Sequence, residues 1–405
     1  MRKEPAVVTL ITLAMLVALV LTTDHWSRQR QGTPTSALGA PARYLWALIG
    51  DGGAHLPEER RAGIRAQIAR LSWRDFAPSE HRINAQYVAR KRGELARLRQ
   101  AGFAVILELG FHDTPAWVHT TYADSYYVDQ YGDRYSGRGT IDSGDANLVF
   151  NPRLRTLVAS YVRDVFNAFG TDFAAVRLGG GHWGELTYPA ATYAGHTNCY
   201  WAFDRAALAA SPTPRWSPGE PSPHEEAGRF LNWYLDMLVD FQNWQIIMLR
   251  QRYRGPLMVL YPSWGIRPGQ IAAAVRGDLG GGTSAEVNGE IQGGLDFARQ
   301  VHAVTDPGVI VTTTWLDADA SGDTSGDQQK WSPIKYLSFL AEANPHRLQR
   351  FGENTGHGAG AAMTLSMTQM KRYGLSGMAW YRESELFSGR YATLDDYKRA
   401  ISLTT

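Results

Sequence analysis

The stretch that decides the fold runs from residue 176 to residue 189 and reads VRLGGGHWGELTYP. A short, mainly apolar run leads into three glycines, a His-Trp-Gly turn and then Glu185. A second stretch of the same kind, residues 350–356, reads RFGENTG and places Glu353 after another short apolar run. Strands that end in a turn carrying a polar residue are typical of barrels built from parallel strands and helices.

Apolar runs of strand length alternate with helix-like patterns from about residue 42 to the end of the chain. We expect eight strands, at residues 44–49, 69–73, 103–109, 173–178, 257–261, 309–314, 348–351 and 375–380. Eight strand–helix units in order predict an α/β fold of the (β/α)8 TIM-barrel class. Two long excursions, at residues 113–150 and 190–227, predict long βα loops, and the tyrosines of the first indicate a substrate wall.

Composition narrows the classes of function. The chain has 405 residues, of which 41 are basic and 39 acidic, for a net charge of +2. No basic block is interleaved with aromatic residues, so nucleic acid is not expected as a partner. The single cysteine, Cys199, excludes an intrachain disulfide and a cysteine-rich zinc cluster. The sequence has no Walker loop and no dinucleotide fingerprint, and we predict neither a cofactor nor a metal.

The N-terminus has the pattern of a targeting segment. Arg2 and Lys3 precede an uncharged apolar run that ends at Thr23, about 27 Å long as a helix. Residues 1–23 therefore predict a signal anchor or, as the alternative, a cleaved signal peptide. Residues 24–41 predict a linker and residues 42–405 the barrel domain. We expect an extracytoplasmic monomer that is membrane-anchored or secreted and touches the membrane only through this segment.

Glu185 and Glu353 would follow the fourth and seventh strands of such a barrel. The ends of those strands lie across the barrel mouth from each other, so both carboxyl groups would face one cleft. A pair of carboxyl groups, one protonated and one ionised, is what hydrolysis of a glycosidic bond requires. The alternative is that each glutamate caps a helix or pairs with an arginine. The joint placement favours catalysis.

The motifs around both glutamates resemble those of the β-amylases and related barrel glycoside hydrolases. Residues 184–189 are similar to that family's Gly-Glu-Leu-Arg-Tyr-Pro motif, which implies that Glu185 is the general acid. Residues 352–354 resemble its Gly-Glu-Asn, which implies that Glu353 is the general base. Residues 314–317 are similar to its Thr-Cys-Leu-Glu inner loop, which implies that Thr314 positions substrate or water. Arg382 matches an arginine that would support the ionised form of Glu353.

The chain also departs from that family. Residues 71–78, LSWRDFAP, replace the acidic segment that grips the terminal glucose and resemble the second strand of family-42-type β-galactosidases. Residues 111–115, FHDTP, stand where the family has a glycine-rich flexible loop, and Asp317 replaces a glutamate. These changes leave the two carboxylates in place and remove the basis for starch specificity. We therefore expect a distant relative that acts on another glycan.

Further candidates for contact with a sugar lie at strand ends or in these motifs. They are Asp51, Trp73, His112, Asp113, Trp183, Tyr188, Trp264, Thr314, Asp317, Asn354 and Arg382. For the histidine and the tryptophans a structural or core role is the alternative. Glu286 and Glu290 are rival carboxylates that could replace Glu353. Asp317, Asp319 and Asp323 have a spacing that fits no EF-hand, and no calcium site is predicted.

The sequence therefore predicts a glycoside hydrolase that uses two glutamates. The resemblance implies inversion of the anomeric carbon, with a retaining enzyme as the alternative. A non-catalytic barrel that binds cell-surface glycans and a transglycosylase remain open. The sequence names neither the sugar nor the linkage.

Overall fold

The structure, a computed structural model, describes residues 44–403 apart from 51, 138–143, 283–285, 287 and 357. The predicted anchor at residues 1–23 and the linker at residues 24–41 lie outside the described residues. Within the described residues no helix has both the length and the apolarity to cross a membrane. The chain from Tyr44 onward forms one compact unit.

Eight parallel strands close into a barrel in sequence order, β1 to β8, with β8 pairing back onto β1. This confirms the predicted (β/α)8 barrel. The strands are β1 (Leu45–Ile49), β2 (Ala66–Arg70), β3 (Ala104–Glu108), β4 (Ala175–Leu178), β5 (Leu257–Tyr261), β6 (Val309–Thr313), β7 (Gln349–Glu353) and β8 (Gly377–Trp380).

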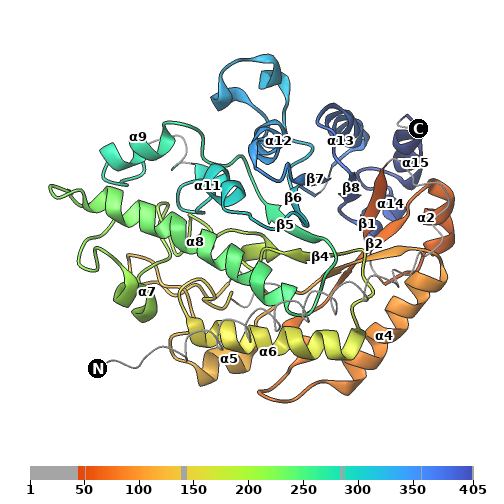
Figure 1. Ribbon diagram of the computed structural model, residues 1–405, viewed down its shortest axis with the longest axis horizontal. Coiled ribbons are helices and arrows are strands. Elements are labelled where there is room, and N and C mark those ends of the chain that lie inside the picture. The colour runs from red at the N-terminus through yellow and green to blue at the C-terminus, as the bar shows by residue number, and fades with distance from the viewer. Residues whose placement is uncertain are drawn as a thin grey trace, which may run out of the picture. The chain divides into compact units, whose positions relative to one another are not determined.

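Helices and short 3-10 turns occupy the connections between strands. In Figure 1 the helices surround the strands, with α6 along the lower edge of the view and α12 and α13 along the upper edge. The α-helices are α2 (Leu56–Ala62), α3 (Trp73–Phe76), α4 (Ala85–Gln100), α5 (Ala116–Thr121), α6 (Pro152–Phe169), α7 (Arg205–Ala210), α8 (Glu226–Arg250), α9 (Gln270–Arg276), α11 (Phe297–His302), α12 (Pro333–Ala343), α13 (Gly360–Arg372), α14 (Glu383–Ser388) and α15 (Leu394–Ser402). The 3-10 turns are η1 (His182–Gly184), η2 (Ser321–Thr324) and η3 (Gln328–Lys330).

Capping chemistry explains where α6 begins. The Asn151 side chain accepts hydrogen bonds from the backbone N–H groups of Arg153 and Leu154, and Pro152 opens α6. Asparagine at the cap and proline at the first helical position satisfy or remove N–H groups that otherwise lack partners.

The second strand was predicted three residues too late. Residues 69–73 were expected to form it, whereas β2 is Ala66–Arg70 and Trp73 opens α3. The Ser72 hydroxyl accepts the backbone N–H of Asp75, which caps α3 and ends the extended stretch. The correction matters because it places Arg70, instead of Trp73, at the mouth of the barrel.

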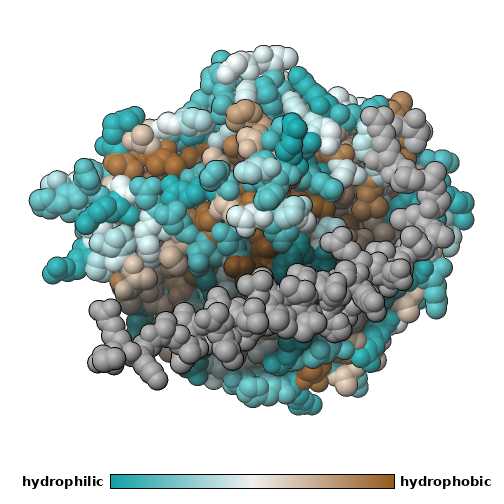
Figure 2. Space-filling view, viewed as in Figure 1, coloured by the Kyte–Doolittle hydropathy of each residue, from teal (hydrophilic) through white to brown (hydrophobic). Residues whose placement is uncertain are grey.

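The barrel encloses its own apolar core, separate from the larger core under the helices. Its members come from alternate positions on all eight strands, among them Ile68, Ile106, Ala175 and Phe351. A cluster that every strand shares can only be the barrel interior. Because side chains alternate along a strand, the residue two positions after each of these also faces inward. Figure 2 shows that the outer face in view is mainly hydrophilic, with hydrophobic side chains in scattered groups.

The long loop at residues 113–150 is packed by its own aromatic rings. Tyr127 and Tyr135 are 2% and 0% exposed, and Tyr122 is also buried, so the prediction of a substrate wall is wrong for these three. A loop of this length needs a small core of its own to hold one conformation. Tyr131 is exposed, and its ring stacks on His196.

Candidate active site

Charged side chains take the inward positions at the carboxyl end of the barrel. The strand register pairs Arg70 with Glu108 and Glu108 with Arg177, so a cation, an anion and a cation lie side by side on β2, β3 and β4. Glu353 is the last residue of β7, two positions after the interior residue Phe351. Catalytic groups of (β/α)8 barrels lie at this end of the strands.

Arg177 joins two of these carboxylates. Its Nη2 donates to Glu353 Oε2 over 2.7 Å, and its Nη1 lies 3.1 Å from Glu108 Oε2. Arg177 is 5% exposed and Glu353 8% exposed. A buried charge is stable only when it is paired, so each partner here requires the other. Arg70, Glu108 and Arg177 are not among the site residues expected from the sequence, because all three lie within apolar runs that predict strands.

The turn that presents Glu185 depends on its glycines. A Cβ at Gly179 would lie 2.4 Å from the carbonyl oxygen of Gly184, and Gly184 itself has φ +80°. A side chain at Gly179 would collide with the backbone, and one at Gly184 would be strained by the left-handed conformation. Hydrogen bonds from Gly181 N to Glu185 O and from Glu185 N to His182 O close the turn. Glu185 is thereby directed to the inner loop, where Thr314 Oγ1 donates to its Oε1 over 2.5 Å.

The two glutamates occupy different electrostatic environments. Burial raises the pKa of Glu185 to about 7, against the hydrogen bond from Thr314 and with a further increase from the charge on Glu353. Burial also raises the pKa of Glu353, while the Arg177 guanidinium, which bonds it directly, acts in the opposite direction. The charge on Glu353 is thus close enough to act on Glu185. A group with a pKa near 7 can give up a proton at neutral pH, and a carboxylate paired with an arginine can stay ionised.

A hollow of about 460 Å³ opens beside Glu185. Its lining comes from the loops after β4 and β5, together with Trp315 after β6. Among the lining residues are Trp183, Glu185, Thr187, Ser263, Glu290 and Trp315. Trp183 is 56% exposed, which is unusual for a tryptophan ring.

Three other predicted site residues also lie at the mouth. Thr314 is buried and bonds Glu185 as described. Asn354 is 2% exposed and uses its amide to bind the backbone of Gly356 and Tyr381, so it joins the loops after β7 and β8. Asp317 accepts the N–H and the hydroxyl of Thr355, which also ties the loop after β6 to the loop after β7.

Two predicted sugar contacts are core residues instead. Trp73 is 1% exposed and packs against Trp117 and Tyr161. Tyr188 is also 1% exposed, stacks on Tyr234 and donates its hydroxyl to the Tyr234 carbonyl. Other aromatic rings pack against both side chains, although Tyr188 is also among the residues that line the hollow beside Glu185.

Four further candidates remain, of which three are described by the structure. His112 is half-buried and lies against Gly184, while Asp113 is 3.5 Å from Arg74. Trp264 is half-buried; its backbone N–H donates to Glu290, and it is not among the residues that line the hollow. Asp51 lies outside the described residues.

Arg382 does not hold the position expected of it. Its guanidinium contacts the Tyr381 hydroxyl and lies 4.0 Å from Glu385. The cation paired with Glu353 is Arg177, which comes from β4 on another side of the barrel. The expectation that Arg382 supports the ionised form of Glu353 is therefore corrected, because that contact belongs to Arg177.

The rival carboxylates bind backbone groups of their own loops. Glu286 is 1% exposed and accepts the N–H groups of Gly281 and Gly282. Glu290 accepts the Ser263 hydroxyl and the Gly265 N–H, so it shapes the loop after β5. Neither stands at the end of a strand in the barrel interior as Glu353 does.

The aspartates after β6 also have protein partners. Asp323 accepts from the N–H and hydroxyl of Ser332 and from the Tyr373 hydroxyl, and Asp319 accepts from Ser321. In the described part of the chain no group of three or more His, Cys, Asp and Glu side chains could hold a metal ion.

A buried His–Asp–Tyr group lies behind the acid turn, and the sequence did not reveal it. His182 Nδ1 lies 3.1 Å from Asp145 Oδ2 and 3.2 Å from the Tyr135 hydroxyl. All three side chains are buried. Their separation along the chain left no local signal, because only folding of the 113–150 loop brings them together. The group anchors the residue that precedes Trp183.

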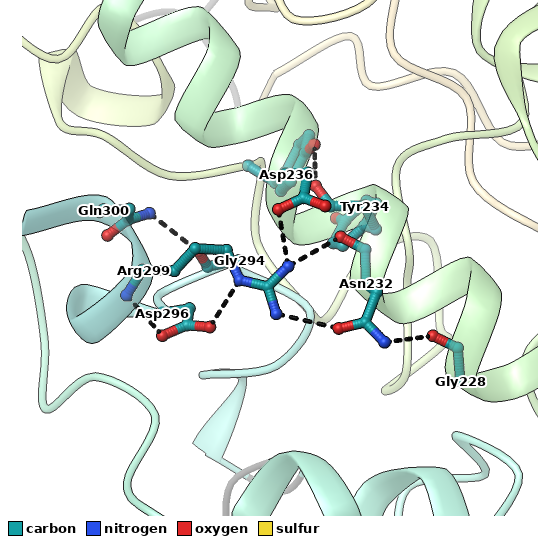
Figure 3. Close-up of polar contacts among 9 residues, drawn as sticks. Gly228, Asn232, Tyr234, Asp236, Gly294, Asp296, Arg299 and Gln300 are labelled. Carbon is teal, nitrogen blue, oxygen red and sulfur yellow. Dashed lines mark hydrogen bonds and ion pairs between the residues drawn. The ribbon is translucent and has the colours of Figure 1, made fainter. Parts of the chain in front are cut away.

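A polar network around Arg299 links the loop after β5 to α8. Figure 3 shows Arg299 between α8 and the segment that leads into α11, bonded to Asn232, Asp236 and Asp296. Gln300 adds a hydrogen bond to the Gly294 carbonyl. The loop that carries Glu290 is thus fixed to α8, the longest helix of the barrel.

Comparison with known proteins finds similar structures but no similar sequence. No protein-family model matches the chain, and no curated protein is similar to it in sequence. The catalytic domain of β-amylase from Paenibacillus polymyxa superimposes with a TM-score of 0.67 at 15% identity, covering 89% of this chain and 98% of that one. A β-galactosidase from the psychrophile Marinomonas ef1 superimposes with a TM-score of 0.55 at 13% identity, covering 89% and 58%.

A family-42 β-galactosidase from G. stearothermophilus gives a TM-score of 0.52 at 15% identity, covering 84% of this chain and 51% of that one. The chain thus spans almost the whole β-amylase domain and just over half of each β-galactosidase. At these identities the likeness establishes the fold. The structural neighbours of this protein are TIM-barrel glycoside hydrolases, with the β-amylase catalytic domain and family-42 β-galactosidases among them.

Proposed function

We propose that this protein is a glycoside hydrolase in which Glu185 is the general acid and Glu353 the base or nucleophile. One observation carries the proposal. Two carboxyl groups share the mouth of the barrel, one with a pKa near 7 and the other ion-paired with a buried arginine. Glycosidic bond hydrolysis needs a carboxylic acid and a carboxylate in one cleft.

The roles follow from the environments. Glu185 gives its proton to the oxygen of the leaving sugar, and its hydrogen bond from Thr314 then stabilises the carboxylate that remains. Glu353, held as a carboxylate by Arg177, takes a proton from the attacking water or attacks the anomeric carbon itself. Following the resemblance to β-amylases, we propose inversion, which requires the two carboxyl groups to be about 6.5–9.5 Å apart, against about 5–5.5 Å for retention.

Replacement of each glutamate tests the assignment. Glu185→Gln and Glu353→Gln in the full-length protein should each remove nearly all hydrolysis on whichever substrate of a bacterial and plant glycan panel the wild type cleaves. Asp319→Asn removes an exposed acid that accepts from Ser321; it is the matched control and should keep wild-type turnover. Wild-type turnover in either glutamate variant would disprove the role given to that residue. Proton NMR of the first anomer formed distinguishes inversion from retention.

We also propose that the domain acts outside the cytoplasm, held by the segment at residues 1–23. An uncharged apolar run behind two basic residues supports this location. A C-terminal alkaline phosphatase fusion in bacteria should be active with the segment present and inactive after its deletion. Activity of both fusion proteins would contradict the location.

A further inference from the structure

The hollow beside Glu185 has a composition of its own. Its volume of about 460 Å³ is within the range of small-molecule sites. Two tryptophans, Trp183 and Trp315, line it together with the carboxyl groups of Glu185 and Glu290. None of the described residues that line it is a lysine or an arginine.

The hollow touches one member of the catalytic pair only. Glu185 is among its lining residues, and Glu353 is not. In glycoside hydrolysis the acid faces the glycosidic oxygen, which departs with the leaving-group sugar. The base or nucleophile faces the anomeric carbon of the other sugar. A cavity that borders the acid without reaching the base therefore lies on the leaving-group side of the bond.

The walls of the hollow are joined before any ligand binds. The Thr187 hydroxyl and the Tyr188 N–H both donate to the Gly293 carbonyl, which links the loop after β4 to the loop after β5. Glu290 adds bonds to the Ser263 hydroxyl and the Gly265 N–H within the second loop. A preformed site loses less entropy on binding than one that must assemble.

Trp183 shows a second feature of a binding residue. It has φ +58°, in the left-handed region that bulky residues rarely adopt, and its ring is 56% exposed. Strain of this kind persists when the surrounding structure enforces it, and it concentrates at ligand sites. Here the buried His182 on one side and the closed glycine turn on the other hold Trp183 outward.

We propose that this hollow binds the leaving-group sugar, stacked on Trp183, and that it takes neutral or amino sugars in preference to sugars that carry a carboxylate. This assignment rests on the proposed hydrolase function. Tryptophan faces bind the apolar faces of sugar rings, and the described lining offers an anion no lysine or arginine as a partner beside Glu290.

Two substrates that differ only in the leaving group test this site apart from the rest of the cleft. One is the oligosaccharide that the glycan panel identifies, and the other is its 4-nitrophenyl glycoside, whose leaving group needs no sugar site. Trp183→Ala should lower kcat/KM about tenfold on the oligosaccharide and leave the aryl glycoside within about twofold. Trp183→Asn also removes the ring and should have the same effect. Because asparagine tolerates the left-handed backbone conformation, this variant controls for a folding defect.

Phe339→Ala is the matched control, since Phe339 is 49% exposed on α12 and is not among the lining residues. It should change neither substrate. Equal losses on both substrates in the Trp183 variants, or no loss on the oligosaccharide, would overturn the leaving-group assignment while the hydrolase function stood. No hydrolysis of any glycan or aryl glycoside by the wild type would instead overturn the proposed function itself.

Inhibition by free sugars tests the charge preference. Hydrolysis of the aryl glycoside at pH 7 is measured with glucose, glucosamine or glucuronate present. Glucuronate should bind at least about tenfold more weakly than glucose, and Trp183→Asn should weaken inhibition by glucose and glucosamine. Glucuronate that inhibits as strongly as glucose would overturn the preference for neutral or amino sugars.

Discussion

Replacing Arg177 with methionine removes a cation that bonds Glu353 directly. Arg177 is 5% exposed and bridges Glu353 at 2.7 Å and Glu108 at 3.1 Å. The substitution therefore leaves both carboxylates in a buried site without the guanidinium that pairs with them. Burial and the charge on Glu108 then raise the pKa of Glu353, opposed by Arg70 but no longer by Arg177. We expect Glu353 to keep its proton to a higher pH than in the wild type, so a smaller share of the protein carries the base or nucleophile at neutral pH.

The magnitudes follow from the burial of the ion pair. Breaking a buried pair by removal of one partner costs about 3–5 kcal/mol of the free energy of unfolding. Protonation of Glu353 relieves part of that cost at low pH, so the loss should be larger at pH 8 than at pH 5. Loss of the base should lower kcat/KM at pH 7 by about 100-fold or more.

Two measurements report the effect. Urea denaturation at pH 5 and pH 8 gives the free energy of unfolding, and a pH profile of kcat/KM gives the acidic limb, where activity rises as Glu353 loses its proton. In Arg177→Met that limb should move to higher pH. Arg177→Lys keeps the charge without the planar fork and should fall between wild type and Arg177→Met.

Arg61→Met is the control, because the Arg61–Glu58 pair is exposed on α2 and should contribute no more than about 1 kcal/mol. An Arg177→Met protein whose stability lies within about 0.5 kcal/mol of wild type, with an acidic limb at the same pH, would refute the role of Arg177.

Three further outcomes are expected. Burial and the neighbouring Glu383 raise the pKa of Glu59 from 4.5 to about 8, so the stability that its protonated form contributes is complete below pH 4.5 and lost as pH rises through about 8. In Glu59→Gln the free energy of unfolding, measured with urea, should therefore depend less on pH between pH 5 and pH 9. An unchanged pH dependence would contradict this. Thr314→Val removes a hydrogen bond that lowers the pKa of Glu185; the basic limb of the kcat/KM profile, where the acid loses its proton, should shift to higher pH, and a shift to lower pH would disprove the contact. Asn354→Ala removes the amide that joins the loops after β7 and β8 and should lower the free energy of unfolding by about 1–3 kcal/mol in urea denaturation. An unchanged free energy of unfolding would contradict these hydrogen bonds.

The fold could be predicted because its signals are local. Each strand is a short apolar run, the α6 helix begins with Asn151 and Pro152, and eight such units in order admit few topologies. Glu185 and Glu353 could be selected for the same reason, since each follows a strand within a short motif. The error at β2 arose where an apolar run continued past the strand, because only the Ser72 cap ends the extended stretch there.

The sequence by itself determined a barrel of eight strands and two glutamates at the ends of two of them. Only the tertiary structure decided which other side chains join that pair, because inward or outward orientation depends on strand register and a shift of three residues reverses it. Arg70, Glu108 and Arg177 meet through the register of β2, β3 and β4, whereas Trp73 and Tyr188, which resemble sugar contacts in the sequence, lie in the core. The pKa of Glu185 likewise depends on burial and on a charge from the other side of the barrel, which arise only when the strands close.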